Sequence, residues 1–372
     1  MNYLFLASFN EILSYVGYIA LAILILLIMI TVHEFGHYVA GKFFGFGIDE
    51  FAIGFGPKLF SKKRKSGEVF SIRLLPIGGF CAFRGEDKDS DDPTAFNNKV
   101  WWQRIIVLIS GALMNYVLAL LVVVIMFSAY GQTSLVACKM ADTDQVESVY
   151  SFEKNDIILS ANGKNVYLLT DLMNAIEGKE QGELVDFVVR RNGVDTPIKI
   201  KLRCDGNFAN LEDNITLLKA LGIYFEEQDG VLVGTGLGRY DIKFGFFETI
   251  GRSFEYSFMM GGMIFKILGQ LITGALGVNT LGGTVTTITV TADAIKVGGF
   301  NYFLNMMSLI GVNLAVFNLL PFPALDGSRV VFTLIEGIRK KPINRRFEAI
   351  IHGIGLVLLL LFAVVVDLQH CF

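Results

Sequence analysis

The sequence predicts a polytopic α-helical membrane protein with four transmembrane helices, a cytoplasmic β segment associated with the membrane, and one extracytoplasmic α/β domain. Of its 372 residues, 53% are hydrophobic and 18% are charged, and the mean hydropathy is +0.53. This balance is too apolar for a soluble protein. The lipid bilayer is therefore the predicted surrounding, whereas a net charge of −3 gives no indication of a nucleic-acid partner.

Four stretches contain the roughly 20 mostly apolar residues that a helix needs to cross the bilayer core. The first shows no small-residue cleavage site after it, so we expect a retained helix rather than a signal peptide. The third is interrupted by two prolines, which end or kink a helix. The stretches run from about Tyr15 to Val39, from Ile105 to Tyr130, from Phe303 through the break at Pro321 and Pro323, and from Ala349 to Val366.

Basic residues are concentrated in the loop between the first two spans and in the loop between the last two. Because Lys and Arg accumulate in cytoplasmic loops, we expect a multi-pass protein of the cell's inner (plasma) membrane with both termini extracytoplasmic. Residues 132–301 would then also lie outside. The basic residues are Lys42, Lys58, Lys62, Lys63, Arg64, Lys65, Arg73 and Arg84 in the first loop, and Arg339, Lys340, Lys341, Arg345 and Arg346 in the second.

The segment outside the membrane divides in two. Strand-like apolar runs and the turn signals Asn162-Gly163 and Asn192-Gly193 predict a small α/β domain. Phe244 to Thr273 has a helical pattern with polar interruptions, and it is either a fifth span or an amphipathic helix pair on the outer surface. We favour the amphipathic pair, because a fifth span would place the C-terminus inside. The predicted regions are 1–130 with two spans, 131–228 as the α/β domain, 229–300 as amphipathic helices, and 301–372 with the last two spans.

Two smaller features complete the predicted architecture. In the first cytoplasmic loop, Phe46 to Gly56 and Val69 to Leu75 flank a basic turn and predict a β-hairpin close to the membrane. In the extracytoplasmic segment, Cys138 and Cys204 allow either a disulfide or two independent thiols.

A metal-binding pattern lies inside the first span, where Thr31 to His37 reads T-V-H-E-F-G-H. His33 and His37 are four residues apart, so on a helix both imidazoles project from one face and can hold one ion. Glu34 sits beside that face, where a carboxylate can take a proton from an activated water. The alternative is that neighbouring helices merely satisfy these three groups. Ionisable residues at membrane depth are costly and by default functional, so we favour a metal site.

A catalytic zinc ion needs three protein ligands and an open fourth position. His370 is predicted near the outer end of the last span, too far away. His352 opens that span and could reach the site or be an interfacial histidine. Asp326 follows the proline break in an otherwise apolar run, and zinc would compensate its charge. We favour Asp326 as the third ligand, with a helix cap as the alternative.

Two motifs together resemble a known family. H-E-F-G-H in the first span and N-L-L-P-F-P-A-L-D-G at Asn318 to Gly327 are similar to the site-2 proteases, which are zinc-dependent intramembrane metalloproteases. The resemblance implies that His33, His37 and Asp326 bind Zn²⁺ and that Glu34 is the catalytic glutamate. Asn318 would donate a hydrogen bond to substrate backbone or to the developing oxyanion; alternatively, the helix end near Pro321 satisfies its amide.

The resemblance extends to the α/β domain. Asn155 to Gly163 is similar to the family's G-D-x-I-x-x-x-N-G, which implies that residues 131–228 form a PDZ-like domain. Asn155 replaces the usual glycine, although Asn also tolerates a left-handed backbone. Tyr150-Ser151-Phe152 departs from the family's approach to this motif, and Leu281 to Thr284 departs where relatives commonly have Gly-Pro.

The resemblance therefore implies an endopeptidase of regulated intramembrane proteolysis and stress response. Its partners would be single-span membrane substrates, such as anti-sigma factors or remnant signal peptides, that have first been cut outside the membrane. A zinc transporter is one alternative, but it would need a series of polar ligands and the sequence offers one cluster. An inactive scaffold that binds partners through the PDZ-like domain is the other, and the intact His33, Glu34, His37 and Asp326 disfavour it.

Overall fold

The computed structural model describes residues 9–86, 90–141, 150–208, 213–228, 231–274, 276–277 and 281–369. Residues 126–252 form one compact unit, and the chain on either side of them forms the other. We call these the sheet unit and the helical unit. Each is described by itself.

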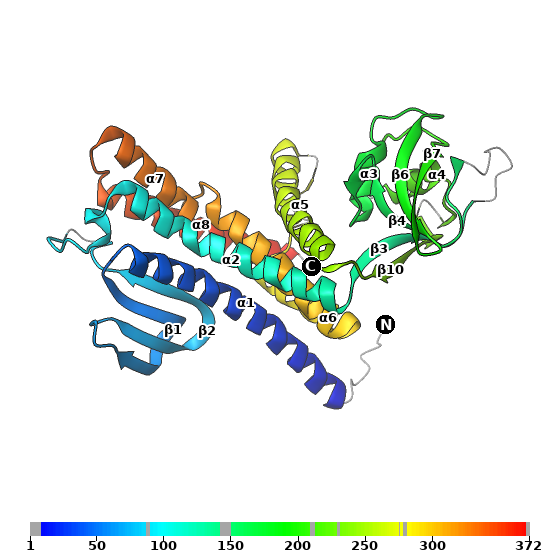
Figure 1. The fold of residues 1–372 in the computed structure, drawn as a ribbon. Helices are drawn as coiled ribbons and strands as arrows, with labels where there is room; N and C mark the ends of the chain where they lie inside the picture. The colour runs from blue at the N-terminus through cyan, green and yellow to red at the C-terminus, as the bar shows by residue number, and fades with distance from the viewer. Residues whose placement is uncertain are drawn as a thin grey trace. The chain divides into compact units, whose positions relative to one another are not determined.

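The helical unit contains, among the described residues, four helices that are long and apolar enough to cross a membrane (Figure 1). This agrees with the predicted number of spans. The third helix begins well before the predicted start near Phe303, and Gly299, with φ +61° and ψ −143°, interrupts its helical backbone. The helices are α1 (Phe9–Phe43), α2 (Trp101–Ala129), α6 (Thr284–Leu319) and α8 (Arg345–Gln369).

Small residues bring these helices into close contact. A Cβ added at Gly36 of α1 would lie 2.4 Å from the carbonyl oxygen of Ser110 in α2. One at Gly311 of α6 would lie 2.9 Å from Ala119 of α2 and 3.1 Å from Met29 of α1. Since helices in lipid associate by packing rather than by a hydrophobic driving force, such positions determine how closely they approach.

Helix α5 (Phe246–Thr273) is one uninterrupted helix over the segment for which a helix pair was predicted. It is not among the four helices apolar enough to span. Its Ile264 is buried against Ala119 of α2 and Val312 of α6, so this helix packs on the side of the bundle. Its depth relative to the membrane surface remains a prediction.

The predicted β-hairpin is present and longer than expected. Strands β1 (Ile48–Lys63) and β2 (Val69–Phe83) pair antiparallel with several register shifts. Glu50 accepts hydrogen bonds from Ser71, Arg73 and Lys58. Partial burial opposes ionisation of Glu50, but these bonds outweigh it and lower its pKa to about 2. These contacts join the two strands, and Ile48 and Phe83 of the hairpin add apolar packing against Phe96 and Val107.

The sheet unit is a small α/β fold. Its main sheet has the order β10-β3-β4-β6-β7, with β5 pairing to β4, and the remaining two strands pair with each other. Because β10 pairs with β3, the unit extends beyond the predicted boundary at residue 228. Its elements are β3 (Gln132–Ala137), β4 (Asp156–Ala161), β5 (Lys164–Asn165), α3 (Leu169–Ile176), β6 (Leu184–Arg191), β7 (Val194–Lys201), α4 (Asn214–Leu221), β8 (Phe225–Gln228), β9 (Val231–Thr235) and β10 (Leu237–Ile242).

Several local predictions for this unit are confirmed. Asn155, Asn162 and Asn192 all have positive φ, as expected at these turns. Cys138 and Cys204 are both free, so the disulfide alternative is not realised.

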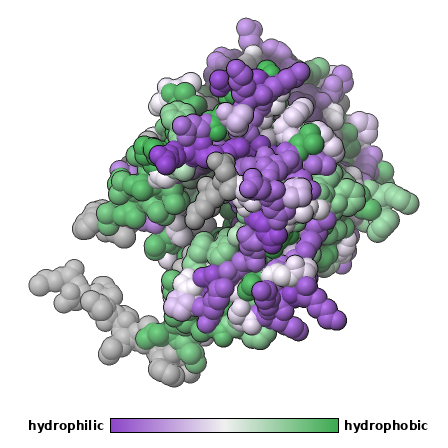
Figure 2. Space-filling view, turned by 90° about the vertical axis from the view of Figure 1, so that its left-hand side faces the viewer, coloured by the Kyte–Doolittle hydropathy of each residue, from purple (hydrophilic) through white to green (hydrophobic). Residues whose placement is uncertain are grey.

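Helix α7 (Asp326–Arg339) is tied to its neighbours by a buried ionic network at one end of the helical unit. Glu336 of α7 binds Arg104 of α2 at 2.6 Å and Arg345 of α8 at 3.0 Å, and the Glu336 and Arg104 side chains are each only 7% exposed. Figure 2 looks onto the end where α7 and the hairpin lie in Figure 1. It shows hydrophilic residues gathered across the middle, with hydrophobic residues on both flanks.

We expect Glu336→Ala to destabilise the helical unit by about 3–5 kcal/mol, because it leaves Arg104 buried without its partner. Thermal unfolding in detergent should show this as a lower midpoint temperature. The matched control is Asp186→Ala, which removes an exposed pair with Lys199 and should cost less than about 1 kcal/mol. Equal midpoints for the two variants would contradict the prediction.

Candidate metal centre

Three side chains from two distant parts of the sequence converge inside the helical unit. His33 Nε2 lies 2.9 Å from Asp326 Oδ2, His37 Nε2 lies 3.3 Å from the same oxygen, and the two Nε2 atoms are 3.1 Å apart. Both imidazoles are buried, and the Asp326 side chain is 20% exposed. Among the described residues, these three form the group of potential metal ligands.

The triangle fits a zinc ion. Zinc binds histidine nitrogen and carboxylate oxygen at about 2.0–2.1 Å, so two ligand atoms of a tetrahedral site lie about 3.3 Å apart. The three separations above are close to that value. The two imidazole nitrogens face each other and the same carboxylate oxygen. Only one proton can lie between any two of these atoms, so hydrogen bonds among them cannot use every lone pair, whereas a cation can.

A backbone group orients His37. Its Nδ1 lies 2.8 Å from the carbonyl oxygen of Val107, which can only accept, so Nδ1 carries the proton and Nε2 presents its lone pair. Second-sphere contacts of this kind fix ring orientation at metal sites. Sequence reasoning missed Val107, because a backbone carbonyl leaves no signal in the residue type.

Helix α2 leaves room for the two rings at a single glycine. A Cβ at Gly111 would lie 2.5 Å from His37 Nε2 and 2.8 Å from His33 Cε1. Any larger residue would therefore push the imidazoles away from their meeting point. Sequence reasoning did not predict this contact, because the residue type alone does not show what a glycine faces.

A tight turn between α6 and α7 places Asp326 beside the two histidines. Helix α6 ends before Pro321, and Ala324 adopts a left-handed backbone with φ +79°. At Gly327 a Cβ would lie 2.3 Å from the carbonyl oxygen of Leu319, so the start of α7 folds directly against the end of α6. The N-cap of α7 is Leu325, and the Asp326 carboxylate faces the histidines. The helix-cap alternative is therefore not observed.

Glu34 lies beside the cluster and faces the hairpin. Its Cγ is 3.4 Å from the place of a Cβ at Gly79 in β2, and the backbone amide of Cys81 is hydrogen-bonded to its carboxylate. The carboxylate thus occupies the side of α1 next to a strand, while the two histidines face α2 and α7.

The other candidate residues are placed as follows. Asn318 Nδ2 lies 3.5 Å from His33 Nδ1. His352 is not part of the cluster and instead contacts the backbone of the α6–α7 turn. His370 lies outside the described residues.

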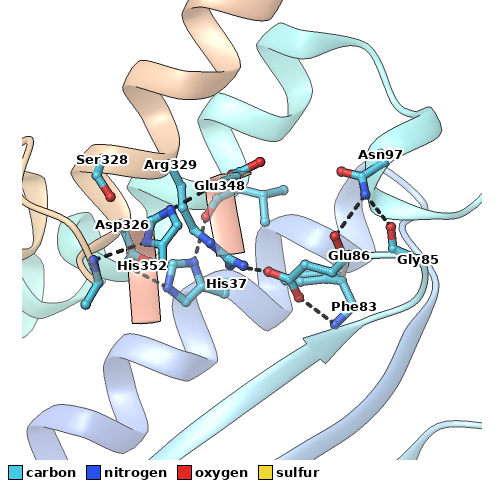
Figure 3. A network of polar contacts seen from close by, with 12 residues as sticks. His37, Phe83, Gly85, Glu86, Asn97, Asp326, Ser328, Arg329, Glu348 and His352 are labelled. Atoms are coloured by element: carbon cyan, nitrogen blue, oxygen red, sulfur yellow. Dashed lines mark hydrogen bonds and ion pairs between the residues drawn. The ribbon is translucent and has the colours of Figure 1, made fainter. Parts of the chain in front are cut away.

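A cavity of about 430 Å³ adjoins the cluster on the side of α8. Asp326, His352, Glu348 and Arg329 line it, and Arg329 forms an ion pair with Glu86 that links α7 to the segment after β2 (Figure 3). Asp326 therefore borders a cavity that charged residues and apolar residues such as Leu108 and Leu356 line together.

Comparisons with known proteins identify the family to which the chain belongs. Residues 21–362 match Peptidase family M50. A Clostridium perfringens protein, named as a candidate zinc metalloprotease, is 33% identical over 95% of this chain and 98% of its own length. Zinc metalloprotease RasP of Bacillus licheniformis is 29% identical over 94% and 98% of the two chains. Regulator of sigma-W protease RasP of Bacillus subtilis is 27% identical over 92% and 96%.

The chain belongs to peptidase family M50, the site-2 proteases. It is a zinc metalloprotease of the membrane, which confirms the predicted enzyme class and cofactor.

We expect Gly111→Ala to weaken zinc binding on the order of 10- to 100-fold, since the added methyl group displaces the histidine rings. Competition with a chromophoric chelator measures this directly. Gly17→Ala in α1, where an added Cβ meets nothing within 4 Å, is the control and should leave zinc affinity unchanged. A Gly111→Ala protein with wild-type affinity would show that the rings do not meet beside α2.

Proposed function

We propose that this protein is an intramembrane endopeptidase that cleaves single-span membrane proteins after a first extracytoplasmic cut. One observation carries the proposal: two imidazoles and a carboxylate converge within a membrane-spanning helix bundle, with the Glu34 carboxylate beside them. Charged and polar groups at such depth are costly unless a function retains them.

In this proposal, His33, His37 and Asp326 hold the zinc ion. When bound, zinc supplies a Lewis acid that polarises the scissile carbonyl and makes a water molecule acidic near neutral pH. Glu34 accepts the proton of the attacking water and later returns it to the leaving amide nitrogen. Glu34 lies on the side of α1 next to β2, where its carboxylate would be close to a substrate segment paired with that strand.

Asn318 would serve two partners through one amide. If His33 binds zinc through Nε2, its proton is on Nδ1. The amide oxygen of Asn318 should then face Nδ1 and accept that proton. This orientation requires only that the amide group of Asn318 be flipped, which exchanges its nitrogen and oxygen. The NH₂ group would then be free to donate to the substrate carbonyl as negative charge develops.

Strand β2 is the proposed docking edge for the substrate. A helical substrate must unwind before its backbone can be attacked, and its freed groups need new partners within the membrane. Pairing with an exposed strand supplies them. Glu34 lies against β2 at Gly79, so a segment paired there would be presented to the catalytic carboxylate.

The surroundings of the reaction follow from the charge pattern and the relatives. We propose that the basic loops and the charged cavity face the cytoplasm, that both termini are extracytoplasmic, and that water reaches the site through the cavity. The α/β unit would act as a PDZ-like size filter that excludes uncut substrates. The name of the Bacillus subtilis relative, a regulator of sigma-W protease, supports a role in stress signalling, with anti-sigma factors or remnant signal peptides as substrates.

Zinc analysis and a cleavage assay on three purified proteins test the proposal. Wild-type protein should contain zinc and cleave a model single-span substrate. Asp326→Ala should lose both properties, whereas Glu34→Gln should keep zinc and lose at least about 10²-fold in rate. Zinc retained by Asp326→Ala would refute the ligand assignment. Unchanged cleavage by Glu34→Gln would refute the catalytic role and leave a zinc-binding transporter or scaffold as the better explanation.

Substrates with weak helices should be cleaved faster. Each Gly→Leu change stabilises a helix by roughly 1 kcal/mol, so replacing two glycines near the scissile bond should slow cleavage by about 10- to 30-fold. The same replacements outside the span of the substrate are the control. Equal rates for all substrates would show that unwinding does not limit the reaction.

A further inference from the structure

His352 in α8 contacts the turn that carries Asp326. Its Nδ1 lies 3.1 Å from the backbone nitrogen of Ala324, two residues before Asp326. An N–H group can only donate, so Nδ1 is the acceptor and the proton of a neutral ring is on Nε2. The other ring nitrogen, Nε2, is buried and lies 4.0 Å from Glu348 Oε1. The ring is therefore engaged with the backbone of the turn, and neither of the roles considered for it from the sequence describes this contact.

The turn needs such a contact, because its conformation is unfavourable by itself. Ala324 has φ +79°, and a left-handed backbone costs roughly 1–2 kcal/mol for a residue with a Cβ. Leu325 and Asp326 follow directly, as the N-cap and first residue of α7. The orientation of the Ala324 peptide thus determines where the Asp326 side chain begins.

Helix α8 supports the same turn at a second point. A Cβ at Gly355 would lie 2.4 Å from Pro323 Cβ and 2.7 Å from the Pro323 carbonyl oxygen. His352 and Gly355 are three residues apart and so share one face of α8. Phe332 of α7 packs edge-on against the His352 ring, with centroids 5.8 Å apart. The imidazole is thereby held between α7 and the turn (Figure 3).

We propose that His352 is a positioning residue for the metal centre: by accepting the Ala324 N–H, it holds the turn in the conformation that delivers Asp326 to His33 and His37. The proposal rests on the proposed role of Asp326 as a zinc ligand. His352 contacts the Ala324 N–H, Glu348 and Phe332, so it would act on Asp326 through the backbone of the turn.

Two substitutions separate the hydrogen bond from the packing. His352→Phe keeps an aromatic ring against Phe332 but has no acceptor, whereas His352→Asn places an amide oxygen close to the position of Nδ1. We expect His352→Phe to weaken zinc binding by about 10- to 100-fold and to alter the visible absorption of the cobalt-substituted protein. His352→Asn should recover zinc affinity to within about threefold of wild type, with a wild-type cobalt spectrum.

Gly355→Ala and Gly353→Ala provide a second, independent pair in case His352→Phe fails to fold. The Gly355 methyl group would push Pro323 and displace the turn, so zinc affinity should fall as in His352→Phe. An added Cβ at Gly353 meets nothing within 4 Å, so Gly353→Ala should bind zinc like wild type.

Zinc affinity measured by chelator competition decides the outcome. The proposal is overturned if His352→Phe binds zinc like wild type, if His352→Asn is as weak as His352→Phe, or if Gly355→Ala and Gly353→Ala behave alike. Asp326→Ala in the same assay distinguishes this failure from that of the proposed function. If Asp326→Ala loses zinc while the His352 variants bind zinc like wild type, only the positioning role of His352 is refuted. If Asp326→Ala retains zinc, the assignment of Asp326 as a zinc ligand is refuted.

Discussion

The structure depends on the meeting of two imidazoles and a carboxylate within an otherwise apolar helix bundle. An isolated carboxylate at this depth would be very costly to bury, and His33, His37 and Asp326 cannot satisfy one another with the few protons available to them. A divalent cation would resolve this conflict, because it would compensate the charge and use all three lone pairs. Much of the rest of the helical unit can be understood as the means of keeping these three groups together.

The close approach of neighbouring helix backbones is the main feature that keeps these three side chains together. Gly36 and Gly111 allow α1 and α2 to touch, and Gly327 allows α7 to fold back on the end of α6. At Gly36 and Gly327 the missing side chain admits backbone of a neighbouring segment, and at Gly111 it leaves room for the His33 and His37 rings. The backbone then contributes directly, since the Val107 carbonyl orients His37 and the Ala324 amide is bound by His352. The same glycines make the site intolerant of even small substitutions.

The sequence predicted which side chains converge better than it predicted the groups that support them. His33 and His37 were evident because their spacing places them on one helix face within an apolar span, and Asp326 because a lone carboxylate follows a proline break. The carbonyl of Val107 and the amide of Ala324 could not be predicted, since a backbone group has no residue-type signature and alanine is not favoured at positive φ. The early start of α6 was missed because Asp293 and Lys296 interrupt its apolar pattern, and the contribution of β10 to the sheet follows only from long-range pairing.

The separation of the ligands along the chain has a consequence for biosynthesis. His33 and Asp326 are 293 residues apart, so a growing polypeptide carries the first two donors long before the third has been made. Until α7 has left the ribosome and folded against α6, Asp326 cannot meet His33 and His37. Only two of the three proposed zinc ligands are then present. With the proposed ligand set, the metal centre can therefore assemble only after nearly the whole chain has been synthesised.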